Sequence, residues 1–332
     1  MGSMMMRRSK ISRRAALGVL VGSVAAAYVR PAKAADTLRV GKAVAENFGY
    51  TPLDIGMAKG IFQRHDIEIA LLNFTGGAKI AQAMAAGSVD ISLSAGPDMQ
   101  FVAKGAPEIA VASITESPVF MGLCISKESP VKTIDDLKGQ QVGIASLGSL
   151  TYWLIDELNR VKGWTGDDRA KQVVVGGSTA ASLAALKTKQ VAASLSATQT
   201  GFLLEDRGEG RLLADCGQYV GPFELFTTFA STELTQKNPD AVRRFLAAWY
   251  ETVDFMRKNK EEVIPLCSKA MTYPPNVAAR AYDVFMPGMS VDGQLRPDAI
   301  EALKSSFADL KAIEGPVDMT KLYTEAYLPK TG

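Results

Sequence analysis

The chain has 332 residues, more than one hydrophobic core usually holds, so its length predicts two domains. Its 37 Lys and Arg nearly balance 35 Asp and Glu, and no basic run is interleaved with aromatic residues, which excludes nucleic acid as a partner. The single histidine, His65, excludes most zinc hydrolase sites, which need more than one, and we expect it to be an ordinary surface residue.

The N-terminal segment has the pattern of an export signal. Basic residues precede an apolar stretch from Ala15 to Val29, which is shorter than the roughly 20 residues that cross a bilayer. Residues 32–34, Ala-Lys-Ala, then fit signal-peptidase cleavage. Residues 12–14, Ser-Arg-Arg, resemble the twin-arginine type, and a general secretory signal is the alternative. We predict a signal peptide over residues 1–34, including tag-like residues at its start, and a soluble periplasmic protein after its removal.

The three cysteines do not form a metal or redox motif. Cys124, Cys216 and Cys267 are an odd set without CxxC spacing. We predict buried free thiols, although an oxidising compartment leaves a disulfide between Cys124 and Cys216 open. No other motif points to a cofactor or a metal, so we predict that the protein carries neither.

Short apolar runs alternate with helical stretches from residue 37 onward, as βαβ units require. Residues 37–43 read as a strand, and residues 51–62 as one helix with Thr51 as its N-cap and Pro52 in its first turn. The strands of these units are expected to be parallel, so that their carboxyl ends share one edge. The next predicted elements are the strand 67–74, the helix 76–87 with Gly87 as C-cap, the strand 89–96, the short helix 132–139, the strand 140–146 and the helix 149–163.

After residue 222 the short alternating strands and helices give way to one strand followed by long helices. Residues 223–231 are rich in Thr, Phe and Leu and read as a strand. Long helices follow over residues 239–259, 277–285 and 296–315. Apolar residues at helical spacing in the first of them predict a face that packs in the core rather than a cofactor site.

A weak internal repeat indicates two similar halves. Residues 74–96 align without gaps with residues 176–198, and both read as loop, helix, strand and loop. The segment ISLSAG faces ASLSAT in this alignment, with Met84 opposite Leu186. The chain is therefore expected to build the same α/β substructure twice.

Four segments, by their order and spacing, resemble the solute-binding proteins of ABC importers for nitrate, sulfonates, taurine and thiamine-type pyrimidines, the NMT1/THI5-like family. They are PLDIGMAKGIF, IEIALLNF, GGAKIAQAMAAGSVDISLSAG and SPVKTIDDLKGQQVGIASLGS. The resemblance covers essentially the whole mature chain. It implies an α/β fold of the type II periplasmic-binding class, with two lobes, two hinge crossovers and a ligand between them. On that template one lobe comprises residues 36–122 and 224–332, and the other comprises residues 123–223.

Gly-, Ser- and Thr-rich loops at the carboxyl ends of the strands are the candidate ligand site, because helix starts there offer N–H groups and hydroxyls to an anion. By resemblance, the helix start at Ser149 holds an anionic group. Glu224 is expected to receive a ligand N–H or ammonium group, whereas Glu116 is expected to be solvated or bound to backbone. The predicted ligand-binding residues are Asn47, Phe48, Tyr50, Thr75, Gly76, Ser94, Ala95, Gly96, Ser117, Gly148, Ser149, Leu150, Thr151, Thr198, Phe223 and Glu224.

The leading functional interpretation is a monomeric, non-enzymatic module that closes on a small molecule and delivers it to the permease of an ABC transporter, its only contact with the membrane. The hydroxyl and amide loops favour a sulfonate or carboxylate, and Glu224 with its neighbouring aromatics favours a pyrimidine or an amine-bearing molecule. Lys42 is the one basic residue in the candidate loops, which argues against nitrate or a dianion. A pyrimidine-forming enzyme on the same fold and a sensor for a membrane receptor are the alternatives.

Overall fold

The computed structural model describes residues 1–2, 35–309, 313 and 315–329. The predicted signal peptide and its twin-arginine motif therefore lie outside the described residues, apart from the first two positions. Within the described part of the chain, no helix is both long enough and apolar enough to cross a membrane. The predicted α/β class is confirmed, because strands and helices alternate along the chain from residue 36.

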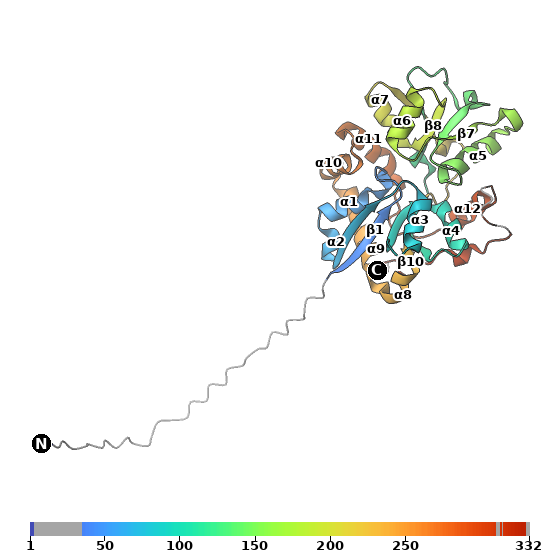
Figure 1. Ribbon diagram of the computed structural model, residues 1–332. Helices are drawn as coiled ribbons and strands as arrows, with labels where there is room; N and C mark the ends of the chain where they lie inside the picture. The colour runs from blue at the N-terminus through green and yellow to red at the C-terminus, as the bar shows by residue number, and fades with distance from the viewer. Residues whose placement is uncertain (3–34, 310–312, 314, 330–332) are drawn as a thin grey trace. The chain divides into compact units, whose positions relative to one another are not determined.

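The first sheet contains five strands in the order β2-β1-β3-β10-β4. Strands β1 and β10 of this sheet are labelled in Figure 1. The strand β1 is parallel to β2 and β3, as predicted, whereas β10 is antiparallel to both of its neighbours, β3 and β4. Strand β10, which lies between β3 and β4, thus comes from a distant part of the chain. The bounds are β1 (Asp36–Lys42), β2 (Ile67–Asn73), β3 (Ile91–Ala95), β4 (Glu108–Thr115) and β10 (Phe226–Ser231).

The second sheet also contains five strands, in the order β7-β6-β8-β5-β9. Here β6 is parallel to β7 and β8, and β5 is antiparallel to β8 and β9. Strand β5 starts just before residue 123, where we placed a lobe boundary, and the division into lobes itself stays a prediction. The bounds are β5 (Met121–Ser126), β6 (Gln141–Ile144), β7 (Lys171–Val174), β8 (Ala193–Ala197) and β9 (Gly210–Asp215).

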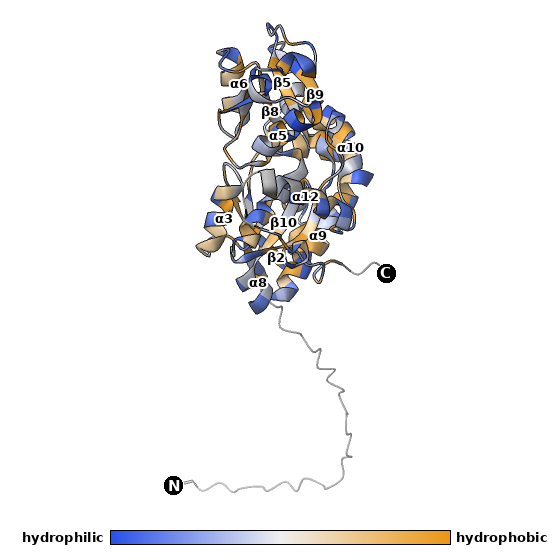
Figure 2. Ribbon diagram, turned by 90° about the vertical axis from the view of Figure 1, so that its right-hand side faces the viewer, coloured by the Kyte–Doolittle hydropathy of each residue, from blue (hydrophilic) through white to orange (hydrophobic). Residues whose placement is uncertain are grey.

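Helices cover both sheets, and the strands β5 and β9 and the helix α9 carry many of the hydrophobic residues seen in Figure 2. The helices are α1 (Thr51–Ala58), α2 (Ile61–Arg64), α3 (Gly77–Ala85), α4 (Met99–Ala103), α5 (Leu150–Lys162), α6 (Thr179–Lys187), α7 (Thr198–Asp206), α8 (Thr232–Lys237), α9 (Pro239–Lys258), α10 (Lys260–Met271), α11 (Pro275–Phe285) and α12 (Pro297–Asp309). The apolar face predicted for residues 239–259 is buried, since Phe245, Leu246 and Trp249 have no exposed surface.

The helix predicted over residues 51–62 is in fact two short helices. Gly60 adopts a left-handed backbone conformation with φ of 64°, which ends α1 and starts α2. The predicted N-cap role of Thr51 is also wrong, because Thr51 is the first helical residue and its hydroxyl donates to the carbonyl of Phe48 at 2.7 Å. Pro52 does lie in the first turn, as predicted.

The internal repeat is visible in the structure. Helix α3 and strand β3 of the first copy correspond residue for residue to helix α6 and strand β8 of the second copy. Each pair belongs to a different sheet, so the chain builds this substructure once in each. Similar substructures place similar loops at the carboxyl ends of β3 and β8.

Two chain segments connect the sheets and are hydrogen bonded to each other. The first leads from β4 to β5 and the second from β9 to β10. The N–H of Phe223 donates to the carbonyl of Glu116 at 3.1 Å, and the N–H of Leu225 donates to the carbonyl of Thr115 at 3.0 Å. These paired crossovers form the hinge region between the sheets.

The three cysteines are free and buried, so Cys124 and Cys216 do not form a disulfide in this structure. Burial raises the pKa of each thiol to about 12. Thiolates are the reactive form, so all three sulfur atoms lie in environments that suppress nucleophilic chemistry. The prediction of buried free thiols is confirmed.

Candidate functional site

A pocket of about 250 Å³ is formed where loops of the two sheets face each other. The first sheet contributes the loops after β1 and β3 and the start of α3, and the second contributes the loops after β6 and β7, the end of β8 and the first turn of α7. These are the carboxyl ends of parallel strands, where α/β sheets usually bind ligands. We call it the cleft pocket. The predicted site residues that line it are Asn47, Tyr50, Gly76, Ser94, Ala95, Gly148, Ser149, Leu150 and Thr151.

The loop after β1 is a rigid wall of the pocket. The side chain of Asn47 caps the short 3₁₀ helix Phe48–Tyr50, since its Oδ1 accepts the N–H of Gly49 at 2.7 Å. The ring of Tyr50 packs against that of Phe226, with 5.3 Å between ring centroids, and both residues line the pocket. Burial raises the pKa of Tyr50 well above its usual value, so its hydroxyl stays neutral.

The first sheet also places a buried carboxyl group in the pocket. Asp98 follows β3, and its carboxylate accepts the hydroxyl of Ser94 and, at 3.3 Å, the N–H of Ala95. Burial raises its pKa to about 6, and these two hydrogen bonds partly oppose that rise. The carboxyl group is close to Gly77, the first residue of α3. Asp98 is thus a hydrogen-bond acceptor that ionises near neutral pH.

The second sheet contributes the start of α5, where Ser149 is the N-cap. Ser149 Oγ accepts the N–H of Tyr152 at 3.4 Å and donates to the carbonyl of Ser146 at 2.7 Å. Thr151 Oγ1 accepts the N–H of Ala145 at 2.9 Å. These hydroxyls therefore shape the loop, and contact between Ser149 and a ligand stays a prediction.

The N-termini of three helices, one beside the first sheet and two beside the second, line the pocket. They are Gly77 at the start of α3, Leu150 at the start of α5 and Thr179 at the start of α6. The N-terminus of a helix carries a partial positive charge and free N–H groups, which stabilise a nearby anion by roughly 0.3 to 1 kcal/mol. The pocket can therefore bind an oxyanion through backbone groups.

The charged side chains of the pocket are acidic. Glu46 and Asp98 line it, and no Lys or Arg is found among its described lining residues. Lys42, the basic residue of the predicted loops, is only 2% exposed and forms an ion pair with Asp54 at 3.0 Å. An ammonium or N–H group of a ligand would thus find an acceptor in the pocket, whereas a doubly charged anion would find no cationic side chain there.

Other predicted site residues do not line the pocket, for reasons that the packing makes clear. Phe48 and Phe223 are in the hydrophobic core, at 0% and 1% exposure. The hydroxyl of Thr198 donates to the carbonyl of Val119 at 2.7 Å, and Thr75 Oγ1 accepts from Lys79 at 2.8 Å. The residues placed outside the cleft pocket are Phe48, Thr75, Gly96, Ser117, Thr198, Phe223 and Glu224.

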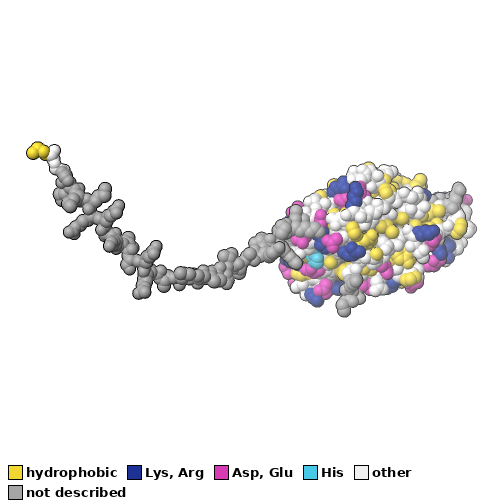
Figure 3. Space-filling view, turned by 90° about the horizontal axis from the view of Figure 1, so that it is seen from below, with side chains coloured by type: hydrophobic (Ala, Val, Ile, Leu, Met, Phe, Trp, Pro, Cys, Tyr) yellow, Lys and Arg dark blue, Asp and Glu magenta, His cyan; other side chains and the backbone are white. Residues whose placement is uncertain are grey.

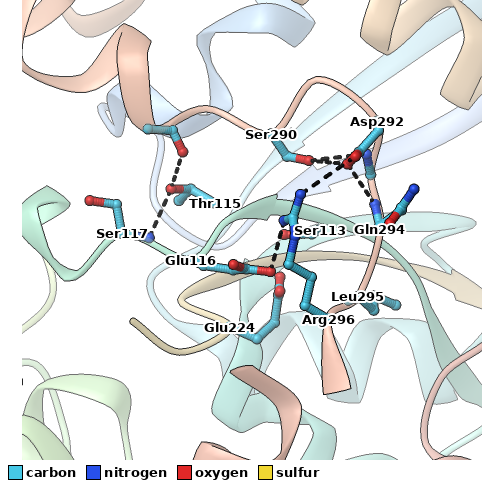
Figure 4. Close-up of polar contacts among 12 residues, drawn as sticks. Ser113, Thr115, Glu116, Ser117, Glu224, Ser290, Asp292, Gln294, Leu295 and Arg296 are labelled. Atoms are coloured by element: carbon cyan, nitrogen blue, oxygen red, sulfur yellow. Dashed lines mark hydrogen bonds and ion pairs between the residues drawn. The ribbon is translucent and has the colours of Figure 1, made fainter. Parts of the chain in front are cut away.

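Glu224 is buried in the hinge region rather than exposed to the pocket. Its side chain has no exposed surface, and its Oε1 accepts the hydroxyl of Thr227 at 2.8 Å. Burial raises its pKa well above the usual value, which favours the protonated form of the carboxyl group. Its carboxyl group points toward the ion pair that Glu116 forms with Arg296 at 3.1 Å (Figure 4). The expectation that Glu116 is solvated or bound to backbone is wrong, because this ion pair holds it.

Ser117 belongs to a separate groove at the hinge, of about 610 Å³, together with Glu116 and Arg296. The N–H of Ser117 donates to Thr115 Oγ1 at 3.1 Å, and the hydroxyl of Thr115 donates to the carbonyl of Gly288 at 2.7 Å (Figure 4). This region therefore holds the crossovers together rather than facing the cleft pocket. Gly96 lies between the two, packed against the backbone of Glu224.

Sequence reasoning missed several pocket residues. The loop before α6, with Gly176 and Ser178, lines the pocket, and Ser178 Oγ accepts the N–H of Ala181 at 3.2 Å as an N-cap. The repeat contained this signal, because the loop corresponds to the predicted loop before α3. Asp98 and Gln100 were also missed, since nothing in their local sequence separates them from ordinary helix residues.

The only histidine of the chain is on the surface, as predicted. His65 Nε2 lies 2.6 Å from a carboxylate oxygen of Glu251, which also pairs with Arg64. In the face shown in Figure 3 the histidine lies among intermixed acidic and basic side chains. Among the described residues, no group of His, Cys, Asp or Glu has an arrangement suited to a metal ion.

Comparison with known proteins identifies relatives of this chain. A family model described as NMT1/THI5 like matches residues 47–263. A Brucella abortus protein named as a provisional binding protein is 28% identical over 254 residues, covering 75% of this chain and 77% of that protein. The 4-amino-5-hydroxymethyl-2-methylpyrimidine phosphate synthase of Candida albicans is 24% identical over 225 residues, covering 64% of this chain. That match spans 65% of the length of the synthase.

Solved structures show the same fold. The periplasmic aliphatic sulphonate binding protein SsuA of Escherichia coli has a TM-score of 0.71 at 20% identity, covering 87% of this chain and 92% of its own. The periplasmic nitrate-binding protein NrtA of Synechocystis has a TM-score of 0.67 at 15% identity, covering 88% of this chain and 86% of its own. The predicted periplasmic-binding-protein fold is thereby confirmed.

Proposed function

The chain belongs to the NMT1/THI5-like family, and we propose that it is a periplasmic solute-binding protein that captures a small organic molecule in the cleft pocket and delivers it to an ABC importer. The cleft pocket carries this proposal, because both sheets contribute helix starts and polar groups to one small cavity. A solute that contacts both sides stabilises the closed arrangement of a hinged protein. The paired crossovers provide that hinge.

The relatives support this proposal. The Brucella abortus protein is named for binding, and the Escherichia coli and Synechocystis structures are periplasmic binding proteins for an aliphatic sulphonate and for nitrate. A protein of this kind works as a monomer outside the cytoplasm, after removal of an export signal. It contacts the membrane only through the permease that receives its solute.

The chemistry of the pocket favours a solute that has an oxygen-rich group at one end and an N–H or amino group at the other. The starts of α5 and α6 offer N–H groups to a sulfonate, a carboxylate or a carbonyl oxygen. Asp98, on the opposite side, accepts an N–H donor, and Tyr50 and Phe226 provide apolar surface for a planar or aliphatic body. An amino-substituted sulfonate or carboxylate meets both requirements, and an aminopyrimidine meets the second.

A pyrimidine-forming enzyme is the second candidate, because the match to the Candida albicans synthase covers 64% of this chain. The histidine and the cysteines of the chain are not placed to catalyse such a reaction in the pocket. His65 is ion-paired at the surface, and the buried cysteines have a raised pKa. A solute sensor that docks on a membrane receptor would use the same pocket in the same way as an importer subunit.

Thermal-shift screening of the mature protein tests the proposal. The panel contains sulfonates, carboxylates and pyrimidines, each with and without an amino group. A solute at 100 times its Kd adds about 2.7 kcal/mol to the free energy of unfolding, so a true ligand gives a large shift. We expect the amino-bearing member of each pair to give the larger shift. Product analysis of the same mixtures tests the enzyme, since a new product would support it. Unchanged pyrimidine is expected for both candidates, because a pyrimidine-forming enzyme releases a pyrimidine as its product.

A further inference from the structure

Two buried glutamines connect the loops of the cleft pocket across the two sheets. Gln100 belongs to α4, beside the first sheet, and its Nε2 donates to the carbonyl of Gly148 in the loop after β6, at 3.4 Å. Gln199 belongs to α7, beside the second sheet, and its Nε2 donates to the carbonyl of Glu46 in the loop after β1, at 3.1 Å. The two hydrogen bonds run in opposite directions, one from each side.

Both acceptors belong to loops that form the pocket wall. Glu46 and Gly148 line the cleft pocket, and so does Gln100 itself. Gly148 has a positive φ of 69°, a backbone conformation that favours glycine, and this conformation orients the carbonyl that Gln100 reaches. Each hydrogen bond therefore fixes a ligand-facing loop of one sheet to a helix beside the other sheet.

The two glutamine side chains are buried, so breaking their hydrogen bonds has a free-energy cost. Gln100 is 5% exposed and Gln199 is 1% exposed. A buried amide that loses its acceptor is left unsatisfied until water reaches it, so separation of the pocket walls has a cost at both positions. The closed arrangement satisfies both amides at once.

Thr179, which also lines the pocket, contacts Tyr273 across the two sides, with 2.9 Å between their hydroxyl oxygens. Other contacts between the two sides lie away from the pocket. Arg280 of α11 lies over the ring of Phe202 at 3.9 Å and pairs with Glu205 of α7, and Asn276 donates to Asp206 at 2.5 Å. These groups do not line the cleft pocket, and the polar ones are largely at the surface. They connect the two sides without determining where the ligand-facing loops lie.

We propose that Gln100 and Gln199 are positioning residues that fasten the two walls of the cleft pocket around the solute and set how fast it leaves. This inference rests on the proposed solute-binding function. Gln100 holds the loop that precedes α5, and Gln199 holds the loop that precedes α1. Loss of either amide donor releases one wall, so the open form becomes more populated and the bound solute escapes sooner.

Distance measurements in the ligand-free protein provide the primary test. Spin labels at Lys79→Cys on α3 and Lys187→Cys on α6 report the separation of the two sides, because both positions are exposed and the native cysteines are buried. Gln100→Met and Gln199→Met keep the size of the side chain and remove the donor. Gln82→Met, on the exposed face of α3, is the matched control.

We expect both variants to shift the label distances toward longer values and Gln82→Met to leave them unchanged. Unchanged distances in both variants would overturn the proposal. Gln100 is the less buried of the two, so its substitution should disturb folding less. If Gln199→Met fails to fold, Gln100→Met alone still tests the proposal. This measurement needs no solute, so it distinguishes a failure of the glutamine contacts from a failure of the proposed function.

Stopped-flow kinetics provide a second readout, with 4-amino-5-hydroxymethyl-2-methylpyrimidine and 2-aminoethanesulfonate as probes. The dissociation rate is expected to rise about tenfold in each variant, as for the loss of a buried hydrogen bond, with little change in the association rate. A fall in the association rate at an unchanged dissociation rate would contradict the proposal. If neither probe binds the wild type, the ligand assignment is wrong and the label distances alone decide.

Discussion

The carboxyl group of Asp98 occupies the space in which a side chain at Gly77 would lie. A Cβ atom added to Gly77 would overlap both carboxylate oxygens of Asp98. The backbone of Gly77 is not in the left-handed region, so the constraint is purely steric. Glycine at the start of α3 thus allows a buried acid to reach the pocket wall.

Replacement of this glycine is expected to disturb the pocket. In Gly77→Ala the new methyl group forces Asp98 away from Ser94, and the free energy of unfolding should fall by about 1 to 3 kcal/mol, as in other overpacked sites. Urea denaturation measures this change. Gly221→Ala is the control, because a Cβ at Gly221 meets open space and should change stability by less than about 0.5 kcal/mol. Equal stability of the two variants would show that the Asp98 carboxyl group moves freely.

Aspartate at position 149 is expected to separate folding from binding. Aspartate is as good an N-cap as serine, so Ser149→Asp should retain the stability of α5, whereas Ser149→Ala should lose about 1 kcal/mol. The added carboxylate faces the place where we expect an oxyanion, so affinity for an organosulfonate should fall by more than about tenfold. Calorimetric titration measures this affinity.

The control for that experiment is Asn238→Asp. Asn238 caps α9 by accepting the N–H of Ala241 at 3.2 Å, and it does not line the cleft pocket. This substitution adds the same charge at an equivalent helix position, so affinity should stay unchanged. Unaltered binding in Ser149→Asp as well would place the oxyanion on another loop.

Binding of an N–H-bearing solute is expected to weaken in mild acid. Asp98 has a pKa of about 6 and accepts an N–H donor best as a carboxylate, so affinity should decrease as the pH falls from about 8 to about 5. The solute must have no titrating group in this range. Asp98→Asn retains an oxygen that can accept from Ser94 but cannot ionise, so its affinity should be lower at pH 8 and independent of pH. The same pH profile in both proteins would assign the dependence to another group.

Glu224→Gln is expected to make stability less sensitive to a rise in pH above about 4.5. The folded protein keeps Glu224 protonated at pH values where the unfolded chain has lost that proton, because burial raises its pKa. In the wild type, protonated Glu224 therefore makes its full contribution to the free energy of unfolding below about pH 4.5, and this contribution decreases as the pH rises. Glutamine keeps the shape without ionising, so the advantage of the variant should grow with pH.

Urea denaturation of both proteins across the pH range measures that difference. Glu108, whose pKa burial raises to about 8, contributes in the same direction in both proteins and cancels in the comparison. Solute binding by Glu224→Gln should change little, because Glu224 does not line the cleft pocket. A large loss of affinity for an amine-bearing solute would show instead that Glu224 contacts the ligand.

Many strands and helices were readable from the sequence because apolar periodicity and turn residues are local signals. The elements that were not predicted are β4, β5, β7, β9, α4, α7, α8 and α10. The repeat located α6 and β8 by comparison with α3 and β3. The break at Gly60 was missed, because the apolar residues on either side continue at helical spacing. A left-handed glycine can end a helix without changing that pattern.

The sequence predicted which loops form the candidate site, but not which side chains of those loops face the pocket. Tyr50 and Phe48 are two positions apart in one loop, yet one lines the pocket and the other packs in the core. Glu224 looked accessible beside two aromatic residues, and packing against the crossovers buries it completely. Whether a loop residue faces the ligand depends on the tertiary packing of both sheets, which local sequence does not encode.

The position of β10 between β3 and β4 has a consequence for the growing chain on the ribosome. The strands of the second sheet are contiguous in sequence, so that sheet can assemble as soon as its own residues emerge. The first sheet must wait, because β3 and β4 acquire their shared neighbour only after Phe226 to Ser231 have been synthesised. Until then both strands expose unpaired edges that invite aggregation, which makes the earlier half of the chain the part most in need of a chaperone.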